Sequence, residues 1–186
     1  MSIYLIRHTV PNLDLGICCG QSDADVAHSF EDEFSNLLPK VSMLNIERIF
    51  SSPLKRSYRL AEKLANSLHL ELKPDDRLKE LDFGAWEMQK WENIMPTELN
   101  LWMVNFVNLR TPQGESYKQM FNRVTDFLNT TDLKNSIIVS HSGVMRSILC
   151  ALTNTPLNEA FKKFRIDYNE IFEVDINQKS YKKILA

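Results

Sequence analysis

Two stretches of the 186-residue sequence decide the fold: IYLIRH at residues 3–8 and IIVSH at residues 137–141. Each is a short apolar run that ends in a histidine, and such runs, rich in β-branched residues, are typical of buried strands. In an open α/β sheet, ligands bind at the edge formed by the carboxyl ends of the strands. We therefore expect His8 and His141 to lie close together at one edge of a sheet.

Strands and helices alternate along the rest of the chain. Residues 46–51 form a third predicted strand, and an amphipathic helix that begins at Pro53 carries Arg56. The other predicted elements are a helix from about residue 29, a short strand at 71–73, a helix introduced by residues 114–116 and ending near 128, a helix over 144–152, and strands near 171–176 and 181–185. This order predicts a single α/β domain, residues 1–186, with a mostly parallel central sheet and helices on both faces.

The segment from about residue 74 to residue 112 differs from the rest of the chain. It carries all three tryptophans and lacks a long hydrophobic period. We expect a loop followed by short helices, which together form a small helical lid over a cleft. The tryptophans are expected to pack within this lid rather than against a ligand.

Composition narrows the classes of partner. The formal net charge of −2 gives no general attraction to nucleic acids or acidic membranes. No apolar run reaches the roughly 20 residues of a membrane-spanning helix, and the chain opens without a secretory signal. The chain has three cysteines, an odd number, and no two of them form a C-x-x-C motif. Both facts argue against a disulfide framework or a zinc site. We expect a cytoplasmic protein that binds a small molecule, not nucleic acid or a membrane, and that needs no metal or cofactor; its oligomeric state stays open.

The residue types at the predicted sheet edge suit phosphoryl transfer. A phosphoryl group in transfer spreads negative charge over its oxygens, so catalysis consists mainly of positioning and electrostatic stabilisation. Guanidinium groups such as those of Arg7 and Arg56 match phosphate geometry and keep their charge. A neutral imidazole can attack phosphorus when one ring nitrogen is held as a donor, and a carboxylic acid can protonate the leaving alkoxide.

Five segments stand in a recognisable order: LIRHT (5–9), SSPLKRS (51–57), LKELDFGAWE (78–87), PQGES (112–116) and VSHSGV (139–144). Together they resemble the histidine phosphatase superfamily, which has the phosphoglycerate mutase-like fold, and they cover nearly the whole chain. The resemblance implies a metal-independent phosphatase in which His8 takes the phosphoryl group and passes it to water. It implies a set of site residues: Arg7, Arg56 and His141 as the phosphate pocket, and Glu80 as proton donor, with Asp82 and Glu87 as alternative acids.

A narrower resemblance rests on four further segments: GQSD (20–23), GAWEM (84–88), FRID (164–167) and VDINQK (174–179). They are similar to segments of the alpha-ribazole phosphatases, a branch that removes the 5′-phosphate from alpha-ribazole phosphate late in cobalamin synthesis. The resemblance implies the same substrate for this chain and places Gln21 near the substrate phosphate. Ser142 is expected to bind substrate as well.

The sequence departs from the family pattern at the phosphate site. Thr9 and Ser142 stand where glycines are usual, and each offers a hydroxyl and some bulk in place of a close backbone approach. Val10 and Pro11 replace the usual Glu-Thr pair. Asp14 stands where many members have a phosphate-contacting asparagine, so that role is not transferred.

Other functions fit parts of the same pattern. A phosphoglycerate mutase, a broad-specificity sugar-phosphate or nucleotide phosphatase, and a non-catalytic phosphate-binding regulatory module are the alternatives. The compact segment 74–112 favours hydrolysis over the mutase reaction. Asp23, Asp25 and His28 match no familiar metal-ligand spacing. No cysteine is followed six positions later by an arginine, which excludes the cysteine phosphatases.

Overall fold

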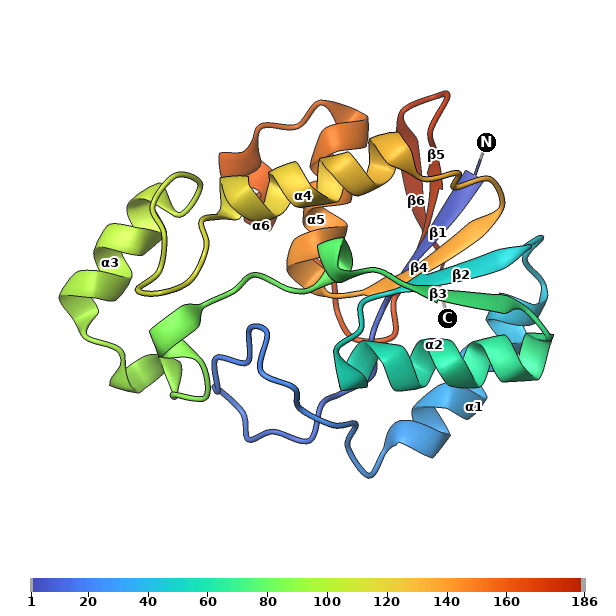
Figure 1. The fold of residues 1–186 in the computed structure, drawn as a ribbon, viewed down its shortest axis with the longest axis horizontal. Helices are drawn as coiled ribbons and strands as arrows, with labels where there is room; N and C mark the ends of the chain where they lie inside the picture. The colour runs from blue at the N-terminus through green and yellow to red at the C-terminus, as the bar shows by residue number, and fades with distance from the viewer. Residues whose placement is uncertain (1, 185–186) are drawn as a thin grey trace.

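The two apolar stretches form adjacent parallel strands. In the computed structural model, which describes residues 2–184, β1 (Ser2–Arg7) pairs in parallel with β4 (Ser136–Ser140). The six-stranded sheet has the order β3-β2-β4-β1-β5-β6 (Figure 1). Its remaining strands are β2 (Arg48–Ser51) and β3 (Glu71–Pro74), both parallel to their neighbours, and β5 (Ile171–Asp175) and β6 (Ser180–Ile184), both antiparallel. The predicted mostly parallel sheet is confirmed, and Leu185, assigned to the last strand, lies outside the described residues.

Each face of the sheet has its own hydrophobic core, because successive strand residues point to opposite faces. Leu5 joins the core formed with α4 (Tyr117–Thr130), α5 (Ser142–Thr153) and the short α6 (Ala160–Lys163). Ile6 joins the core formed with α1 (Phe30–Ser42) and α2 (Lys55–Leu68). Figure 1 shows these two groups of helices on opposite sides of the strands, as the sequence predicts.

The starts of two helices depend on side chains that the sequence analysis did not connect. Helix α2 begins at Lys55, with Leu54 as its N-cap, so the prediction that Pro53 occupies its first turn is wrong. The backbone N–H of Lys55 donates to Asp23 Oδ1 at 2.8 Å, which ties the start of α2 to the loop after β1. Helix α4 starts with a capping box between Ser116 and Gln119, which satisfies two otherwise unpaired backbone N–H groups.

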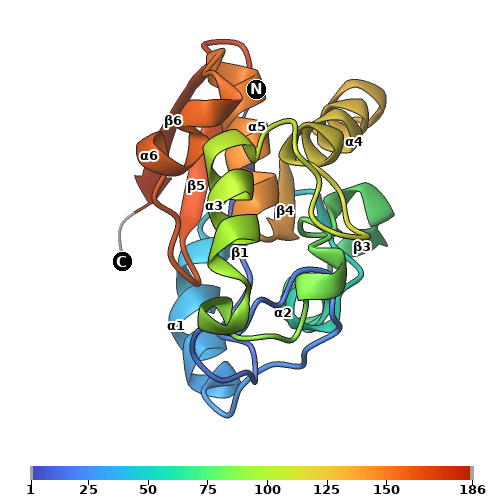
Figure 2. The same ribbon diagram turned by 90° about the vertical axis from the view of Figure 1, so that its left-hand side faces the viewer.

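The segment after β3 consists of short helices. It contains the 3₁₀ turns η1 (Asp76–Leu78), η2 (Gly84–Trp86) and η3 (Trp91–Asn93), followed by α3 (Pro96–Asn105). The rings of Trp86 and Trp102 are buried and meet edge to face, with centroids 5.8 Å apart. Helix α3 stands apart from the sheet at one end of the molecule (Figures 1 and 2).

No helix in residues 2–184 combines the length and the apolar character needed to cross a bilayer.

Candidate active site

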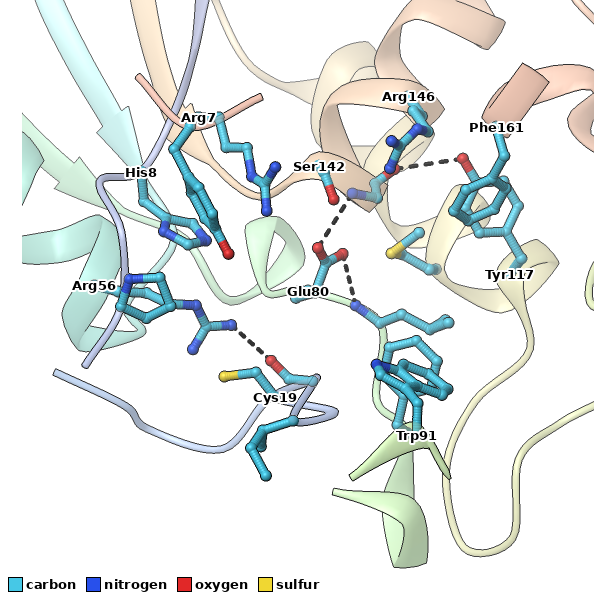
Figure 3. Close-up of a pocket in the computed structure, with 18 residues that line it drawn as sticks. Arg7, His8, Cys19, Arg56, Glu80, Trp91, Tyr117, Ser142, Arg146 and Phe161 are labelled. Carbon is cyan, nitrogen blue, oxygen red and sulfur yellow. Dashed lines mark hydrogen bonds between the residues drawn. The ribbon is translucent and has the colours of Figure 1, made fainter. Parts of the chain in front are cut away.

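A pocket of about 280 Å³ opens where β1 and β4 end (Figure 3). Of the predicted site residues, those that line it are Arg7, His8, Arg56, Glu80 and Ser142. His141 is fully buried beside His8, whereas Gln21 does not line the pocket. We call Arg7, His8, Arg56 and His141 the phosphate end of the pocket.

His8 is held in one tautomer. Its Nδ1 lies 2.6 Å from the carbonyl oxygen of Thr9, which can only accept, so Nδ1 carries the proton and Nε2 keeps its lone pair. The side chain is 4% exposed. Burial, followed by the positive charges of Arg56 and Arg7, holds the pKa of His8 well below its ordinary value. His8 is therefore a neutral imidazole with a free ring nitrogen, the form that a nucleophile requires.

His141 lies against His8 at the same site. The two imidazole centroids lie 5.0 Å apart at an interplanar angle of 64°. His141 Nε2 lies 2.8 Å from Ser52 Oγ, whose hydroxyl can donate its proton to the ring while it accepts the Leu54 N–H. With that donation, Nδ1 carries the ring proton, as in His8, and this buried nitrogen has no hydrogen-bond partner within residues 2–184. It is a donor available to a phosphate oxygen, and burial followed by the charge of Arg56 lowers the pKa of the ring.

Arg56 is a buried cation that is held by neutral groups. It is 2% exposed, and its two terminal nitrogens donate to the carbonyl oxygens of Ser22 at 2.8 Å and Gly20 at 2.6 Å. Carbonyl acceptors fix the guanidinium without neutralising its charge. Since Arg56 lies on α2 and both acceptors lie in the loop after β1, that loop supports the phosphate end.

Arg7 is positioned by the chain just before β5. Its Nη1 donates to the carbonyl oxygen of Ile166 at 2.8 Å, and its guanidinium carbon lies 3.7 Å from the ring centroid of Tyr168. A cation over an aromatic face at this distance is attracted by the ring. The buried Nε of Arg7 has no partner among the described residues. Tyr168, which also lies 5.5 Å from the His8 ring, was not singled out from the sequence.

Glu80 is the candidate acid that faces the pocket. Its carboxylate accepts the backbone N–H groups of Leu81 at 3.0 Å and Gly143 at 3.2 Å (Figure 3). A Cβ at Gly143 would lie 2.3 Å from Glu80 Oε1, so the glycine leaves room for this close approach. Glu80 thus lies beside the start of α5, between the phosphate end and the lid.

The two alternative acids have other partners and do not line the pocket. Asp82 accepts the N–H of Gly84 at 2.8 Å and so stabilises the turn into η2. Glu87 accepts the N–H of Gln21 at 2.7 Å and the hydroxyl of Ser22 at 2.6 Å. Their geometry suits holding the backbone rather than protonating a leaving group.

Gln21 fixes the loop after β1 instead of facing the phosphate end. Its Nε2 donates to the carbonyl oxygen of Glu80 at 3.0 Å, and its backbone N–H donates to Glu87. The structure therefore does not bring Gln21 to the position that the resemblance implies. Ser142 does line the pocket, at the first residue of α5.

The far side of the pocket was not anticipated from the sequence. We call it the leaving-group end and define it by Phe83, Trp91, Tyr117, Arg146 and Phe161. These residues come from the lid, α4, α5 and α6. One sequence signal was present: Arg146 lies four positions after Ser142, so both side chains fall on one face of a helix. Cys19, whose pKa is raised mainly by burial, lines the pocket near Arg56.

Two acidic residues of the loop after β1 form ion pairs with bases of α2. Asp23 forms an ion pair with Lys55 at 3.3 Å, and Asp25 forms one with Arg59 at 2.9 Å, while His28 is exposed. Within residues 2–184, no group of three or more His, Cys, Asp or Glu side chains is arranged to hold a metal ion.

Comparison with known proteins places this geometry in a family. The chain matches the histidine phosphatase superfamily (branch 1) over residues 3–185. The chain belongs to the histidine phosphatase superfamily. It is 29% identical over 167 residues to phosphoserine phosphatase 1 of Hydrogenobacter thermophilus, covering 86% of this chain and 79% of the relative. It is 26% identical over 188 residues to the adenosylcobalamin/alpha-ribazole phosphatase of Escherichia coli K12, and the match covers 96% of this chain and 92% of the relative.

Among solved structures, the alpha-ribazole phosphatase from Shigella flexneri has the same fold. The TM-score is 0.87 at 23% identity, and the match covers 100% of this chain and 95% of that chain. The superfamily match and these phosphatase relatives identify the chain as a phosphatase that acts on small phosphate esters.

One departure from the superfamily pattern is built into the phosphate end. Thr9, where the superfamily usually has glycine, is completely buried, and its carbonyl oxygen is the group that orients His8. Its Oγ1 is buried without a hydrogen-bond partner in the described part of the chain. The threonine is thus accommodated without loss of the contact that sets the tautomer of His8.

Proposed function

We propose that this histidine phosphatase hydrolyses a small phosphomonoester in two steps through phosphohistidine at His8. The observation that carries the proposal is the state of His8: a buried neutral ring, with Nδ1 held by a carbonyl and a free Nε2 beside two guanidiniums. In the first step, Nε2 attacks phosphorus and the bond from phosphorus to the ester oxygen breaks. The leaving alkoxide takes a proton from the carboxyl group of Glu80.

In the second step, water attacks the phosphohistidine. The Glu80 carboxylate, now ionised, accepts a proton from that water, and the bond between phosphorus and Nε2 breaks. Inorganic phosphate leaves, and His8 returns to its neutral form. Acid and base are the same group because the second step is chemically the reverse of the first, with water in place of the alcohol.

Three donors stabilise the charge that builds on the phosphoryl oxygens: Arg7, Arg56 and the Nδ1–H of His141. Each is fixed before substrate binds. Arg7 is held by Tyr168 and a carbonyl oxygen, Arg56 by two carbonyl oxygens, and the His141 ring by Ser52. Preorganised donors of this kind typically contribute about 2.7–4 kcal/mol each to transition-state stabilisation.

For the specific substrate we propose alpha-ribazole 5′-phosphate, as a step of cobalamin synthesis, as the first candidate. The four segments that resemble the alpha-ribazole phosphatases support it, as do the E. coli relative and the S. flexneri structure. The aromatic rings of the leaving-group end could pack against its benzimidazole.

A phosphomonoester of the phosphoserine type is the second candidate. The H. thermophilus relative supports it, and so does Arg146, which brings a further positive charge to the leaving-group end. A phosphoglycerate mutase and a broad-specificity phosphatase are tested by the same experiment.

The test is phosphate release from a panel containing alpha-ribazole 5′-phosphate, O-phospho-L-serine, sugar phosphates, nucleotides and 3-phosphoglycerate. The proposal expects phosphate release from at least one of them, without interconversion of 3- and 2-phosphoglycerate. Interconversion without release would make the protein a mutase. Binding of phosphate without any turnover would make it a non-catalytic module.

A further inference from the structure

Arg146 enters the pocket from α5, one helical turn after Ser142. Its Nε donates to the carbonyl oxygen of Phe164 at 2.9 Å, and its guanidinium carbon lies 4.7 Å from the ring centroid of Phe161. Figure 3 shows Arg146 beside Tyr117 and Phe161, with Ser142 between it and Arg7. One edge of the guanidinium is therefore fixed by protein, while its two terminal nitrogens are left for another acceptor.

Arginines without a carboxylate partner are concentrated in this pocket. The chain has nine arginines, all within residues 2–184, and five of them form ion pairs: Arg48, Arg59, Arg77, Arg123 and Arg165. Three of the other four, Arg7, Arg56 and Arg146, line the pocket. Unpaired guanidiniums at one pocket indicate that it binds more than one anionic group.

In the proposed mechanism, the positive charge of Arg146 is not matched by a negative charge of the pocket or of the phosphate group. The described lining contains three guanidiniums and one carboxylate, that of Glu80. To protonate the leaving group, Glu80 starts in its neutral form, and the two charges of a phosphate dianion are met by Arg7 and Arg56. Arg146 then has no counterion among the residues that line the pocket, and it is half-buried, where desolvation of its charge is costly.

We propose that Arg146 binds a carboxylate on the leaving alcohol, so that the pocket selects phosphomonoesters that carry one. This inference rests on the proposed phosphatase function and favours the second candidate substrate over the first. The rings of Tyr117 and Phe161 pack on one another and form an apolar wall at this end of the pocket, and a less polar surrounding strengthens a guanidinium–carboxylate contact. Arg146 lies outside the phosphate end, so its effect on catalysis belongs to substrate choice.

The test compares substrates that differ by one carboxylate. O-phospho-L-serine is matched with phosphoethanolamine, and 3-phosphoglycerate is matched with glycerol 3-phosphate. In the wild-type protein, kcat/KM is expected to be about 10- to 100-fold higher for the carboxylate member of each pair. Arg146→Gln should bring this ratio to about 1, with less than about a threefold change for the carboxylate-free members.

Two further variants make the comparison specific. Arg165→Gln, which removes an arginine that is exposed and lies outside the pocket, should leave the ratio unchanged. Arg146→Lys keeps the positive charge without the planar fork and should keep part of the preference. If Arg146→Gln does not fold, the wild-type ratio and Arg146→Lys still decide the question.

Equal kcat/KM within both pairs in the wild-type protein would overturn this inference, as would an equal loss for both members in Arg146→Gln. Either result, obtained with turnover intact, leaves the phosphohistidine mechanism standing. Absence of all phosphomonoester hydrolysis would instead overturn the proposed function together with this inference.

Discussion

The two ends of the pocket are built in different ways. At the phosphate end, His8 and His141 follow directly after parallel neighbouring strands, and both are almost completely buried. Backbone carbonyls and a serine hydroxyl hold this end in place. At the leaving-group end, rings from different elements pack on one another, as Tyr117 and Phe161 do at 5.6 Å. The sheet edge therefore positions the groups proposed for the chemistry, whereas the lid segment and the helices α4–α6 shape the space around the leaving group.

The largest expected effect is at the phosphate end. His8→Ala removes the nucleophile, so kcat should fall by at least about 10⁴-fold for every substrate, whatever its leaving group. Phosphate release under saturating substrate measures the loss. His28→Ala is the matched control, since His28 is exposed and outside the pocket. Turnover of His8→Ala at the wild-type rate would disprove the role of His8.

Glu80 lies between the two ends, and its effect should depend on the leaving group. Glu80→Gln cannot supply a proton, so kcat should fall by about 10²- to 10⁴-fold for alkyl phosphates. p-Nitrophenyl phosphate should lose much less, because its phenolate leaves without a proton. Asp82→Asn is the control, because Asp82 stabilises a turn and does not line the pocket. The same loss for both kinds of substrate would argue against Glu80 as the acid.

Arg56 tests whether geometry or charge alone matters at the phosphate end. Arg56→Lys keeps a positive charge but cannot hold the carbonyl oxygens of Gly20 and Ser22 together. We expect kcat/KM to fall by about 10- to 100-fold and vanadate to bind more weakly. Arg59→Lys, on the exposed side of the same helix, should change neither quantity. Full activity of Arg56→Lys would show that the fork geometry is dispensable.

The convergence of His8 and His141 could be predicted from the sequence, because strand order alone brings them together. His8 and His141 had to meet once two apolar strands were placed side by side with their carboxyl ends at one edge. Gln21 was misplaced because its position depends on how the loop after β1 contacts Glu87 in the lid, and no periodicity encodes that contact. Arg146 was missed for a related reason: its surroundings arise from α4, α5 and α6 together.

The buried histidines should also make stability depend on pH. The pKa values of both histidines are lowered in the folded protein. Below pH about 6.5, the ordinary pKa of histidine, the unfolded chain therefore binds more protons than the folded chain. The free energy of unfolding should be highest above that pH and fall by about 1.4 kcal/mol per pH unit for each histidine as pH decreases. Urea unfolding of the wild type and His8→Asn at pH 7.5 and 5.5 measures this, with a smaller decrease expected for the variant. An equal decrease in both proteins would contradict the lowered pKa of His8.

The smallest expected effect comes from the contact between the lid and the loop after β1. The Glu87 carboxylate accepts the Gln21 N–H with one oxygen and the Ser22 hydroxyl with the other. In Glu87→Gln, an NH2 group that cannot accept a hydrogen bond replaces one of these oxygens, so one of the two bonds is lost. Because Ser22 also holds Arg56, KM should rise about three- to tenfold with little change in kcat. Glu92→Gln, in the same lid but exposed, should have no effect. A loss of kcat that depends on the leaving group would make Glu87 the acid in place of Glu80.

The central claim is that the phosphoryl group passes through His8. Rapid acid-free quenching of the protein with a ³²P-labelled phosphomonoester, followed by peptide mapping, tests it most directly. We expect phosphate that is stable to base, labile to acid and attached to the peptide containing His8, and that is absent from His8→Ala. Covalent phosphate on any other residue, or steady turnover with no covalent phosphate at all, would contradict it.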